Sequence, residues 1–316
     1  MHDLLLIGGI TSEMRARLER RFRIHALNML DDDALSALGG QITHVATNGH
    51  DGVPARVMAA LPNLQMVACF GVGYDAIDTD SCVARGIPVS HTPDVLNAEV
   101  ATTAVMLMLA CYRNLVSDDA YVRAGRWAQE GSAPLSRSAD RRKVGLVGMG
   151  RIGQEIARKL SVFDAEISYH SRTPKDVPYQ YCPNLVDMAQ DADVLIVITP
   201  GGAATRHLVN GRVLDALGPE GTLINVARGS VVDEEALVAA LQEGRLGWAG
   251  LDVFEAEPQV PEALLGMSNV VLLPHAGSAT VETRRAMGAL VVDNLLAHLD
   301  DGTLLTPVPE CRHLLP

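Results

Sequence analysis

The fold is decided by the stretch Val144-Gly145-Leu146-Val147-Gly148-Met149-Gly150-Arg151-Ile152-Gly153, near the middle of the chain. Its first four residues are apolar or small, and further apolar residues follow the glycines at helical spacing, which predicts a strand that turns into a helix. The glycines have the spacing G-x-G-x-x-G. In this pattern the first makes a tight turn, the second lets backbone N–H groups approach a pyrophosphate, and the third packs helix against strand. The N-terminus of a helix attracts phosphate. We therefore predict a dinucleotide site at Gly148, Gly150 and Gly153.

The composition limits the class of protein. The 316 residues suffice for about two domains, and 48% of them are hydrophobic. The net charge of -12 argues against a nucleic-acid surface, because the one Lys/Arg cluster is Arg141-Arg142-Lys143. The longest apolar stretch, residues 100–111, is too short to span a bilayer and predicts a buried helix. We expect a soluble protein with no nucleic-acid partner and no membrane association.

The cysteines indicate a reducing compartment. There are five, and none forms a C-x-x-C pair. Cys69 and Cys111 lie in apolar runs that are typical of core thiols. The N-terminal Met1-His2-Asp3 has neither a basic region nor a cleavage site of a signal peptide. We expect a cytoplasmic location.

The chain before the glycine stretch alternates short apolar runs with helical patterns. Such alternation predicts a parallel sheet with helices on both faces. We take Ser12 and the Asp31–Asp33 group as helix N-caps. The expected strands are 4–7, 42–46, 65–69 and 87–89, and the expected helices are 12–20, 31–38 and 54–61. These elements form a small α/β domain of the flavodoxin-like class.

The rest of the chain predicts a second α/β domain. Residues 98–113 predict one long buried helix, and a polar connector of less regular pattern follows at 124–142. A final helix near 280–299 is expected to return to the first domain. After the glycine stretch we expect strands at 166–169, 194–198, 222–226, 249–252 and 270–272.

The expected architecture is therefore two doubly wound parallel-sheet domains. A Rossmann dinucleotide-binding domain, residues 97–280, is inserted in a smaller, discontinuous substrate domain of residues 1–96 plus 281–316. Ligands of open α/β sheets bind beyond the carboxyl ends of the strands, so the site residues are sought there.

Three polar residues follow three of the later strands. Arg228, Glu257 and His275 come after the strands 222–226, 249–252 and 270–272. Taken singly, each has an ordinary interpretation: a surface charge, a turn before proline, and a structural histidine. Together, beside a dinucleotide site, they suit the reduction of a 2-keto acid. A guanidinium holds a carboxylate bidentately and polarises the adjacent ketone, while an imidazolium stabilised by a carboxylate donates the proton.

The end of the second Rossmann strand bears on the cofactor. An NAD site requires an acid there to bind the ribose hydroxyls. This chain instead continues Ser171-Arg172-Thr173-Pro174-Lys175, with a hydroxyl and a guanidinium that suit a 2'-phosphate. We predict NADPH/NADP+ in preference to NADH, bound by Ser171 and Arg172; the alternative is an incidental exposed arginine. Thr199, Pro200 and Thr205, after the strand 194–198, are expected to line the adenosine side.

Four motifs occur in an order that resembles a known family. They are residues 148–153, 225–230, 250–258 and 274–280, and together they are similar to the D-isomer-specific 2-hydroxyacid dehydrogenases. The resemblance runs nearly end to end, since Thr92–Leu96 and Gly125–Trp127 also fit. One departure lies at Thr102 and Thr103, where many relatives carry an acid, so we assign neither a role.

The resemblance implies roles for individual residues. Arg228 would bind the substrate carboxylate, His275 would be the acid/base in contact with substrate, and Glu257 its partner. Asp252 would face the nicotinamide carboxamide, and the N–H groups of Val72 and Gly73 would bind the substrate carboxylate. The further cofactor contacts implied are Arg151, Ile152, Thr173, Ala227, Gly277 and Ser278.

The resemblance also implies a branch of the family and an assembly. The pattern at Ser171-Arg172 is similar to the glyoxylate/hydroxypyruvate and hydroxyphenylpyruvate reductases, which use NADPH. A homodimer through the Rossmann domains is implied, with residues 98–127 contributing. We expect NADPH-dependent reduction of glyoxylate, hydroxypyruvate or a similar small 2-keto acid to the D-2-hydroxy acid.

Two alternatives stay open. Within the class, the substrate could be an aryl 2-keto acid such as hydroxyphenylpyruvate. Outside it, the chain could be a nucleotide-sensing binding protein of the same fold, because corepressors that share this fold can keep the same three polar residues. Substrate-dependent oxidation of NADPH distinguishes an enzyme from a sensor.

Overall fold

The computed structural model describes residues 1–315. The chain divides into two compact units, one formed by Met1–Leu96 together with the chain from Thr280 onward, the other by Asn97–Ala279. The last residue of the expected substrate domain, Pro316, lies outside the described residues. The assignment of substrate binding to the first unit stays a prediction.

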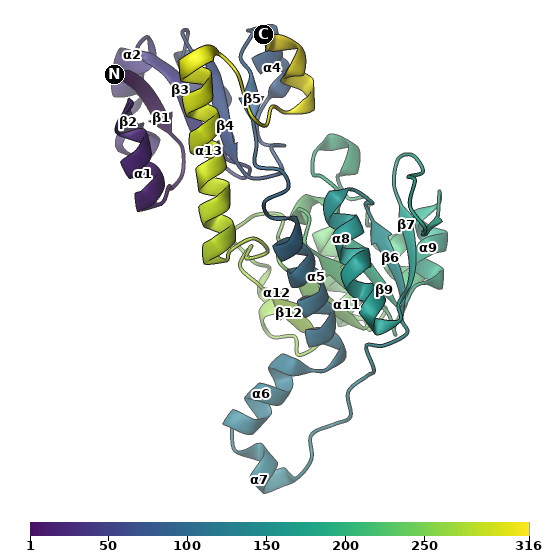
Figure 1. Ribbon diagram of the computed structural model, residues 1–316. Coiled ribbons are helices and arrows are strands. Elements are labelled where there is room, and N and C mark those ends of the chain that lie inside the picture. The colour runs from purple at the N-terminus through teal and green to yellow at the C-terminus, as the bar shows by residue number, and fades with distance from the viewer. Residues whose placement is uncertain (316) are drawn as a thin grey trace. The chain divides into compact units, whose positions relative to one another are not determined.

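The first unit is built on a five-stranded sheet (Figure 1). Every neighbouring pair is parallel, and the order β2-β1-β3-β4-β5 is that of flavodoxin-like folds, as expected. Alternate residues of β1 serve the two faces: Leu5 packs in one apolar cluster, while Leu4 and Leu6 pack in the other. The strands are β1 His2–Leu6, β2 Phe22–Ala26, β3 Ile42–Asn48, β4 Met66–Phe70 and β5 Val89–Ser90.

Helices cover both faces of this sheet. The cluster around Leu5 includes Leu35 and Val57 of the second and third helices, whereas the cluster around Leu4 includes residues of the first and last. The helices are α1 Ser12–Leu18, α2 Asp32–Gly39, α3 Ala55–Ala60, α4 Thr79–Ala84 and α13 Val281–Asp301, with 3-10 turns at Leu27–Met29 and Pro309–Leu314.

The first unit differs from the expectations at a helix cap and in two elements that were not predicted, the strand β2 and the helix α4. Ser12 was expected to cap α1, but the cap is Thr11, whose side chain accepts a hydrogen bond from the N–H of Met14 at 3.2 Å. Asp31 caps α2 as predicted. The strand β2 was not predicted, because this edge strand alternates polar with apolar residues over only five positions.

The second unit contains a seven-stranded, wholly parallel sheet in the order β12-β11-β10-β9-β6-β7-β8. Counted within the unit, this is the Rossmann order 3-2-1-4-5-6 with one further edge strand. The fold class predicted from the sequence is thus confirmed. The strands are β6 Lys143–Val147, β7 Glu166–His170, β8 Gln180–Tyr181, β9 Val194–Val197, β10 Thr222–Asn225, β11 Trp248–Leu251 and β12 Val270–Leu272.

The helices of the second unit again lie on both faces. Figure 1 shows α5 and α8 side by side, and they pack together over the sheet. The buried helix expected at 98–113 is α5, Asn97–Tyr112. The others are α6 Leu115–Arg123, α7 Arg126–Glu130, α8 Arg151–Leu160, α9 Leu185–Asp191, α10 Gly211–Leu217, α11 Glu234–Gln242 and α12 Glu262–Leu265, with 3-10 turns at Ser161–Phe163, Ala203–Thr205 and Gly229–Val231.

The connector is more ordered than expected. It begins with α7, in which Arg126 pairs with Glu130 one turn later at 2.8 Å and stacks on the ring of Tyr121 from α6. Within residues 1–315, we find no single helix with the length and apolar character of a membrane span. The pair α5 and α6 meets that measure together, but it bends by 59° at its break.

Candidate active site

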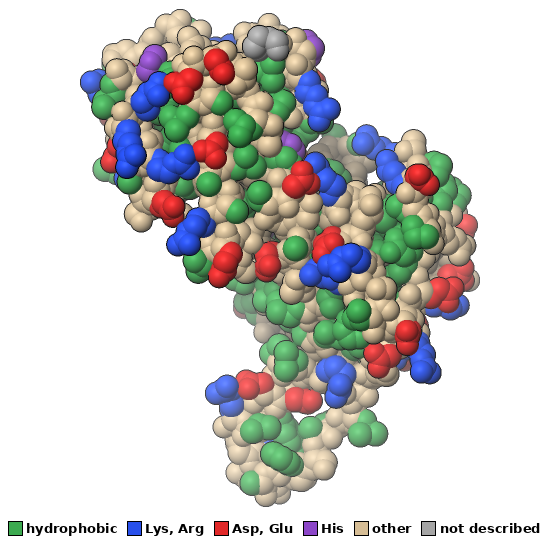
Figure 2. Space-filling view, in the orientation of Figure 1, with side chains coloured by type: hydrophobic (Ala, Val, Ile, Leu, Met, Phe, Trp, Pro, Cys, Tyr) green, Lys and Arg blue, Asp and Glu red, His purple; other side chains and the backbone are tan. Residues whose placement is uncertain are grey.

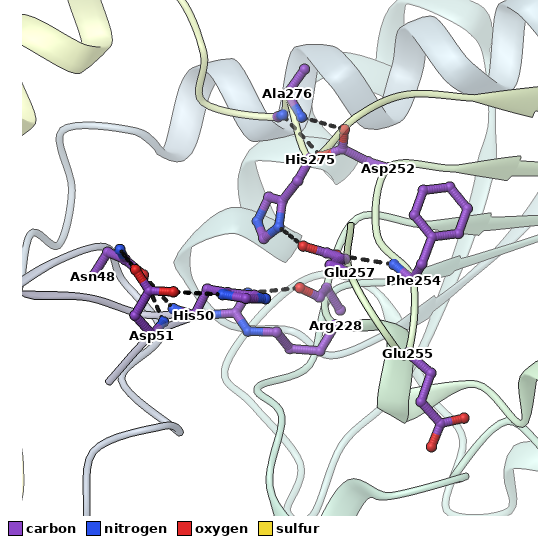
Figure 3. Close-up of polar contacts among 12 residues, drawn as sticks. Asn48, His50, Asp51, Arg228, Asp252, Phe254, Glu255, Glu257, His275 and Ala276 are labelled. Carbon is purple, nitrogen blue, oxygen red and sulfur yellow. Dashed lines mark hydrogen bonds and ion pairs between the residues drawn. The ribbon is translucent and has the colours of Figure 1, made fainter. Parts of the chain in front are cut away.

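Three neighbouring strands deliver the polar residues to one edge of the second unit. Because β10, β11 and β12 are adjacent and parallel, the segments that follow them leave from the same edge of the sheet. Arg228, Glu257 and His275 lie in these segments, and Figure 3 shows their side chains gathered there. The structure therefore brings together the three residues that the sequence singled out.

His275 and Glu257 form a hydrogen-bonded pair. Nδ1 of His275 lies 2.7 Å from Oε2 of Glu257, and the other carboxylate oxygen accepts the N–H of Phe254 at 3.0 Å. A carboxylate on Nδ1 selects the ring form with the proton there, so Nε2 is the nitrogen left for a ligand. His275 also has a left-handed backbone, φ +52°, which is uncommon for a non-glycine residue and is found at functional sites.

Asp252, at the end of β11, anchors the loop that carries His275. Its carboxylate accepts the N–H groups of Ala276 and Gly277 at 2.6 and 2.8 Å, and its own carbonyl accepts the N–H of His275. Burial raises the pKa of this carboxyl, while the two backbone hydrogen bonds oppose the rise. Both oxygens are thus engaged within the loop, and the expected contact with the nicotinamide stays a prediction.

The loop that carries Arg228 is fixed by a buried amide. The side chain of Asn225 accepts the N–H of Ala227 at 3.1 Å and donates to the carbonyl of Arg228 at 3.1 Å. Arg228 is half-buried, and its Nη1 donates to the carbonyl of Ala227 at 2.8 Å. Gly229 then lies directly against the backbone of Phe254, so the arginine loop contacts the turn that carries Glu257.

The glycine loop has the geometry that a dinucleotide requires. Gly148 has φ +113°, and a Cβ on it would lie 3.0 Å from the backbone of Ile198. A Cβ on Gly153 would lie 2.4 Å from the carbonyl of Gly148, so this glycine sets how closely helix and turn pack. The position of a Cβ on Gly150, the N-cap of the ten-residue α8, is open space. The residues fit a pyrophosphate at the start of α8.

The other expected cofactor residues follow strands of the same sheet. Arg151 and Ile152 begin α8; Arg151 is exposed and Ile152 is half-buried. After β7, Arg172 and Thr173 are exposed, and the hydroxyl of Ser171 donates to the carbonyl of Thr173 at 2.7 Å. After β9, the hydroxyl of Thr205 closes the loop from Thr199 by donating to the carbonyl of Pro200 at 2.7 Å.

Three remaining expected residues lie in the loops already described. Ala227 is buried beside Arg228, Gly277 is buried beside His275, and Ser278 is half-buried. The carbonyl of Gly277 accepts the hydroxyl of Thr103 in α5 at 3.2 Å. Thr103, to which the sequence assigned no role, therefore supports the histidine loop.

In the first unit, Val72 and Gly73 follow β4. The carbonyl of Val72 accepts Nδ1 of the buried His91 at 3.0 Å, and the carbonyl of Gly73 faces the thiol of Cys69 at 3.7 Å. Within residues 1–315, the N–H of neither residue donates to a backbone carbonyl. The loop therefore turns its carbonyls toward protein donors, and the expected contact of its N–H groups with the substrate stays a prediction.

Comparison with known proteins identifies the family. Residues 105–277 match the family model described as D-isomer specific 2-hydroxyacid dehydrogenase, NAD binding domain. The chain belongs to the D-isomer-specific 2-hydroxyacid dehydrogenase family. The resemblance inferred from the four motifs is thus confirmed.

Relatives within this family match over almost their whole length. Glyoxylate/hydroxypyruvate reductase A of Arabidopsis thaliana is 47% identical over 308 residues, 96% of this chain and 98% of the relative. 2-Ketogluconate reductase of Gluconobacter oxydans is 45% identical over 309 residues, 97% and 98% of the two chains. A crystal structure of an NADPH-dependent glyoxylate/hydroxypyruvate reductase from Sinorhizobium meliloti, in complex with NADP and malonate, has a TM-score of 0.94 at 50% identity. The match covers 98% of this chain and 97% of that chain.

Sequence reasoning missed the residues that hold the loops of this family member in place. Asn225 was part of a quoted motif, yet nothing in one sequence shows that its amide binds both ends of the arginine turn. The role of Gly229 is likewise not visible in one sequence, because its contact with Phe254 joins loops 25 residues apart in the chain. The signal that could have found Asn225 is an amide side chain that directly follows two apolar residues at the end of a buried strand.

Proposed function

We propose that this protein is an NADPH-dependent reductase that converts a small 2-keto acid, of the glyoxylate or hydroxypyruvate type, to the D-2-hydroxy acid. The observation that carries the proposal is the His275–Glu257 pair, 2.7 Å apart, on the sheet edge that also presents Arg228 and the glycine loop. Family membership and the reductases at 45–50% identity support the same reaction class.

The substrate carboxylate is assigned to two groups of donors. The guanidinium of Arg228 offers a bidentate fork that also polarises the adjacent ketone. The N–H groups of Val72 and Gly73 in the first unit are the second group, supported by the inward orientation of their carbonyls. This assigns the first unit to substrate binding.

Proton transfer is assigned to His275. Glu257 holds Nδ1, stabilises the imidazolium and fixes the ring, so that Nε2 gives its proton to the carbonyl oxygen of the substrate. When bound, the reduced nicotinamide supplies the hydride that the carbonyl carbon receives. Asp252 holds the backbone next to His275 during this transfer.

The cofactor is assigned as NADPH. The glycine loop and the start of α8 hold the pyrophosphate, with Arg151 and Ile152 in the first turn. Ser171, Arg172 and Thr173 hold the 2'-phosphate, since no carboxylate stands at the end of β7 to repel it. The relative from Sinorhizobium meliloti, described as NADPH-dependent, supports this choice. The adenosine side falls to Thr199, Pro200 and Thr205, and the nicotinamide side to Ala227, Asp252, Gly277 and Ser278.

We also propose a homodimer and a cytoplasmic location. Figure 2 shows hydrophobic side chains exposed on the α6–α7 segment. Leu115, Val116, Val122 and Trp127 are each more than half exposed there, and such a patch is typical of a protein interface. Sedimentation velocity at micromolar concentration tests the dimer, and a monomer would contradict it. The five cysteines are free thiols, as expected in a reducing cytoplasm.

Steady-state kinetics test the reaction. Glyoxylate, hydroxypyruvate, 2-ketogluconate and hydroxyphenylpyruvate are compared with NADPH and with NADH. We expect the highest kcat/KM for a small 2-keto acid with NADPH. A preference for hydroxyphenylpyruvate would instead support the aryl alternative, and a higher kcat/KM with NADH would contradict the cofactor assignment. The absence of turnover with every compound would support the nucleotide-sensing alternative.

A further inference from the structure

The turn Phe254–Glu257 carries two carboxylates with different partners. Glu257 binds His275, whereas Glu255 points away from it in Figure 3. Oε1 of Glu255 lies 2.6 Å from Nη2 of Arg206 and 3.2 Å from Nε2 of His207. One short turn therefore contacts two histidines, each through a carboxylate.

Both histidines have the same uncommon backbone conformation. The φ angle is +50° at His207 and +52° at His275, in the left-handed region. A non-glycine residue keeps this conformation only where its surroundings determine it strongly, and such residues concentrate at functional sites. His275 is explained by proton transfer, but nothing in the proposed reaction explains His207.

The segment that contains His207 links the cofactor loop to the arginine loop. It follows directly on the loop from Thr199 to Thr205, which Thr205 closes by its bond to Pro200. It then pairs with the chain after Arg228: the N–H of His207 donates to the carbonyl of Ser230 at 2.8 Å, and the N–H of Val209 to that of Val231 at 3.0 Å. Arg206 and His207 thus stand between the cofactor loop and the turn that carries Glu257.

A third carboxylate supports the same turn from α11. Oε1 of Glu234 accepts the N–H of Glu255 at 3.1 Å, next to the N–H of Phe254 that Glu257 accepts. Burial raises the pKa of Glu234, and the charges of Glu255 and Glu257 raise it further, against the opposing effect of its bond to Glu255. Three acidic side chains therefore share this turn, and Arg206 pairs with one of them, Glu255.

We propose that Glu255, held by Arg206 and His207, is a positioning residue that fixes the turn of Glu257 and ties the cofactor loop to the proton donor His275. The proposal rests on the function proposed above. The proposal places Glu255 in contact with neither the substrate nor the nicotinamide. It acts through the backbone of its turn and through its charge. The charged and titratable groups around it are Arg206 and His207 from the loop, Glu234 and the nearby Asp233 from the start of α11, and Glu257 from the same turn.

The test compares Glu255→Gln with Arg206→Gln. Both variants break the same ion pair, so a merely structural role predicts similar effects. The proposal predicts that kcat for the 2-keto acid falls about 10-fold in both, while KM changes less than about 3-fold. It also predicts opposite movements of the alkaline limb of kcat/KM, which marks loss of the proton from His275.

The opposite movements follow from charge. Glu255→Gln removes a negative charge from the turn that carries Glu257, the partner of His275, so the alkaline limb moves to lower pH. Arg206→Gln removes the positive charge paired with Glu255, so the limb moves to higher pH; we expect about 0.3 pH unit in each case. Glu243→Gln is the matched control, because Glu243 is exposed and pairs with a neighbour in the chain, Arg245, at 2.6 Å. It should leave kcat and the pH profile unchanged.

The outcomes separate this proposal from the proposed function. If the wild-type protein turns over but both variants keep wild-type kcat, or move the limb in the same direction, the positioning role is wrong. If the wild-type protein turns over no 2-keto acid, the proposed reaction is wrong. In that case NMR titration of the His275 ring in the same variants tests the positioning role of Glu255. Opposite shifts of the midpoint in the two variants support this role, and shifts in one direction or no shifts overturn it.

Discussion

Gly229 and Phe254 meet backbone to backbone. A Cβ on Gly229 would lie 1.9 Å from the carbonyl carbon of Phe254 and 2.1 Å from its oxygen, so the position accepts no side chain. The contact joins the loop after β10 to the turn after β11. It therefore sets how far Arg228 stands from Glu257 and, through it, from His275.

Gly229→Ala tests this contact. The added methyl must push the two loops apart, so we expect kcat/KM to fall at least about 100-fold and the free energy of unfolding to fall by about 2 kcal/mol. Kinetics and chemical denaturation measure the two effects. Gly266→Ala is the control, since a Cβ there meets open space and its φ is -96°. Equal losses in both variants would show that the loss does not arise from the contact of Gly229 with Phe254.

The His275–Glu257 pair predicts a separation of catalysis from cofactor binding. His275→Ala removes the proton donor, and kcat should fall about 1,000-fold. In Glu257→Gln the side-chain oxygen can still accept a hydrogen bond from Nδ1 of His275, but the side chain carries no charge. We expect kcat to fall about 100-fold. The Kd for NADPH, measured by fluorescence, should change less than about 2-fold in both. Retained turnover in His275→Ala would mean that another group donates the proton.

The fold and the polar residues of the site were predictable because they depend on local patterns. Apolar runs and helical spacing gave both sheets, and the positions after strands gave Arg228, Glu257 and His275. The strand β2 and the helices α4 and α7 were among the elements missed, because their patterns are short and polar. Asn225, Glu255 and Gly229 were missed for another reason: their partners are far along the chain or belong to the backbone, and one sequence does not show such contacts.

Arg172 predicts cofactor selectivity. It is exposed after β7 and carries the charge assigned to the 2'-phosphate. A charge-assisted hydrogen bond contributes about 2 kcal/mol, so Arg172→Ala should raise KM for NADPH about 30-fold and leave KM for NADH nearly unchanged. Arg212→Ala, at an exposed position on α10, is the control and should alter neither. An equal loss with both cofactors would contradict a contact with the phosphate.

A buried pair of histidines in the first unit predicts how stability depends on pH. His44 in β3 is fully buried, with Nε2 3.1 Å from Nδ1 of His298 in α13 and Nδ1 2.8 Å from the hydroxyl of Thr43. Burial, with smaller contributions from the nearby His298 and His2, lowers the pKa of His44 to about 3. Burial also lowers the pKa of His298.

The sign follows from where the proton binds. In the unfolded chain His44 ionises near pH 6.5, whereas in the folded protein it stays neutral to about pH 3. Between these values the unfolded state binds more protons, so stability is lost as the pH falls. Between pH 7 and pH 5 the loss from His44 is about 2 kcal/mol. Urea unfolding at both pH values measures it. His44→Leu should remove most of that loss, and His313→Gln, at an exposed position, should keep it. The same pH dependence in His44→Leu as in the wild-type protein would show that another group binds the proton.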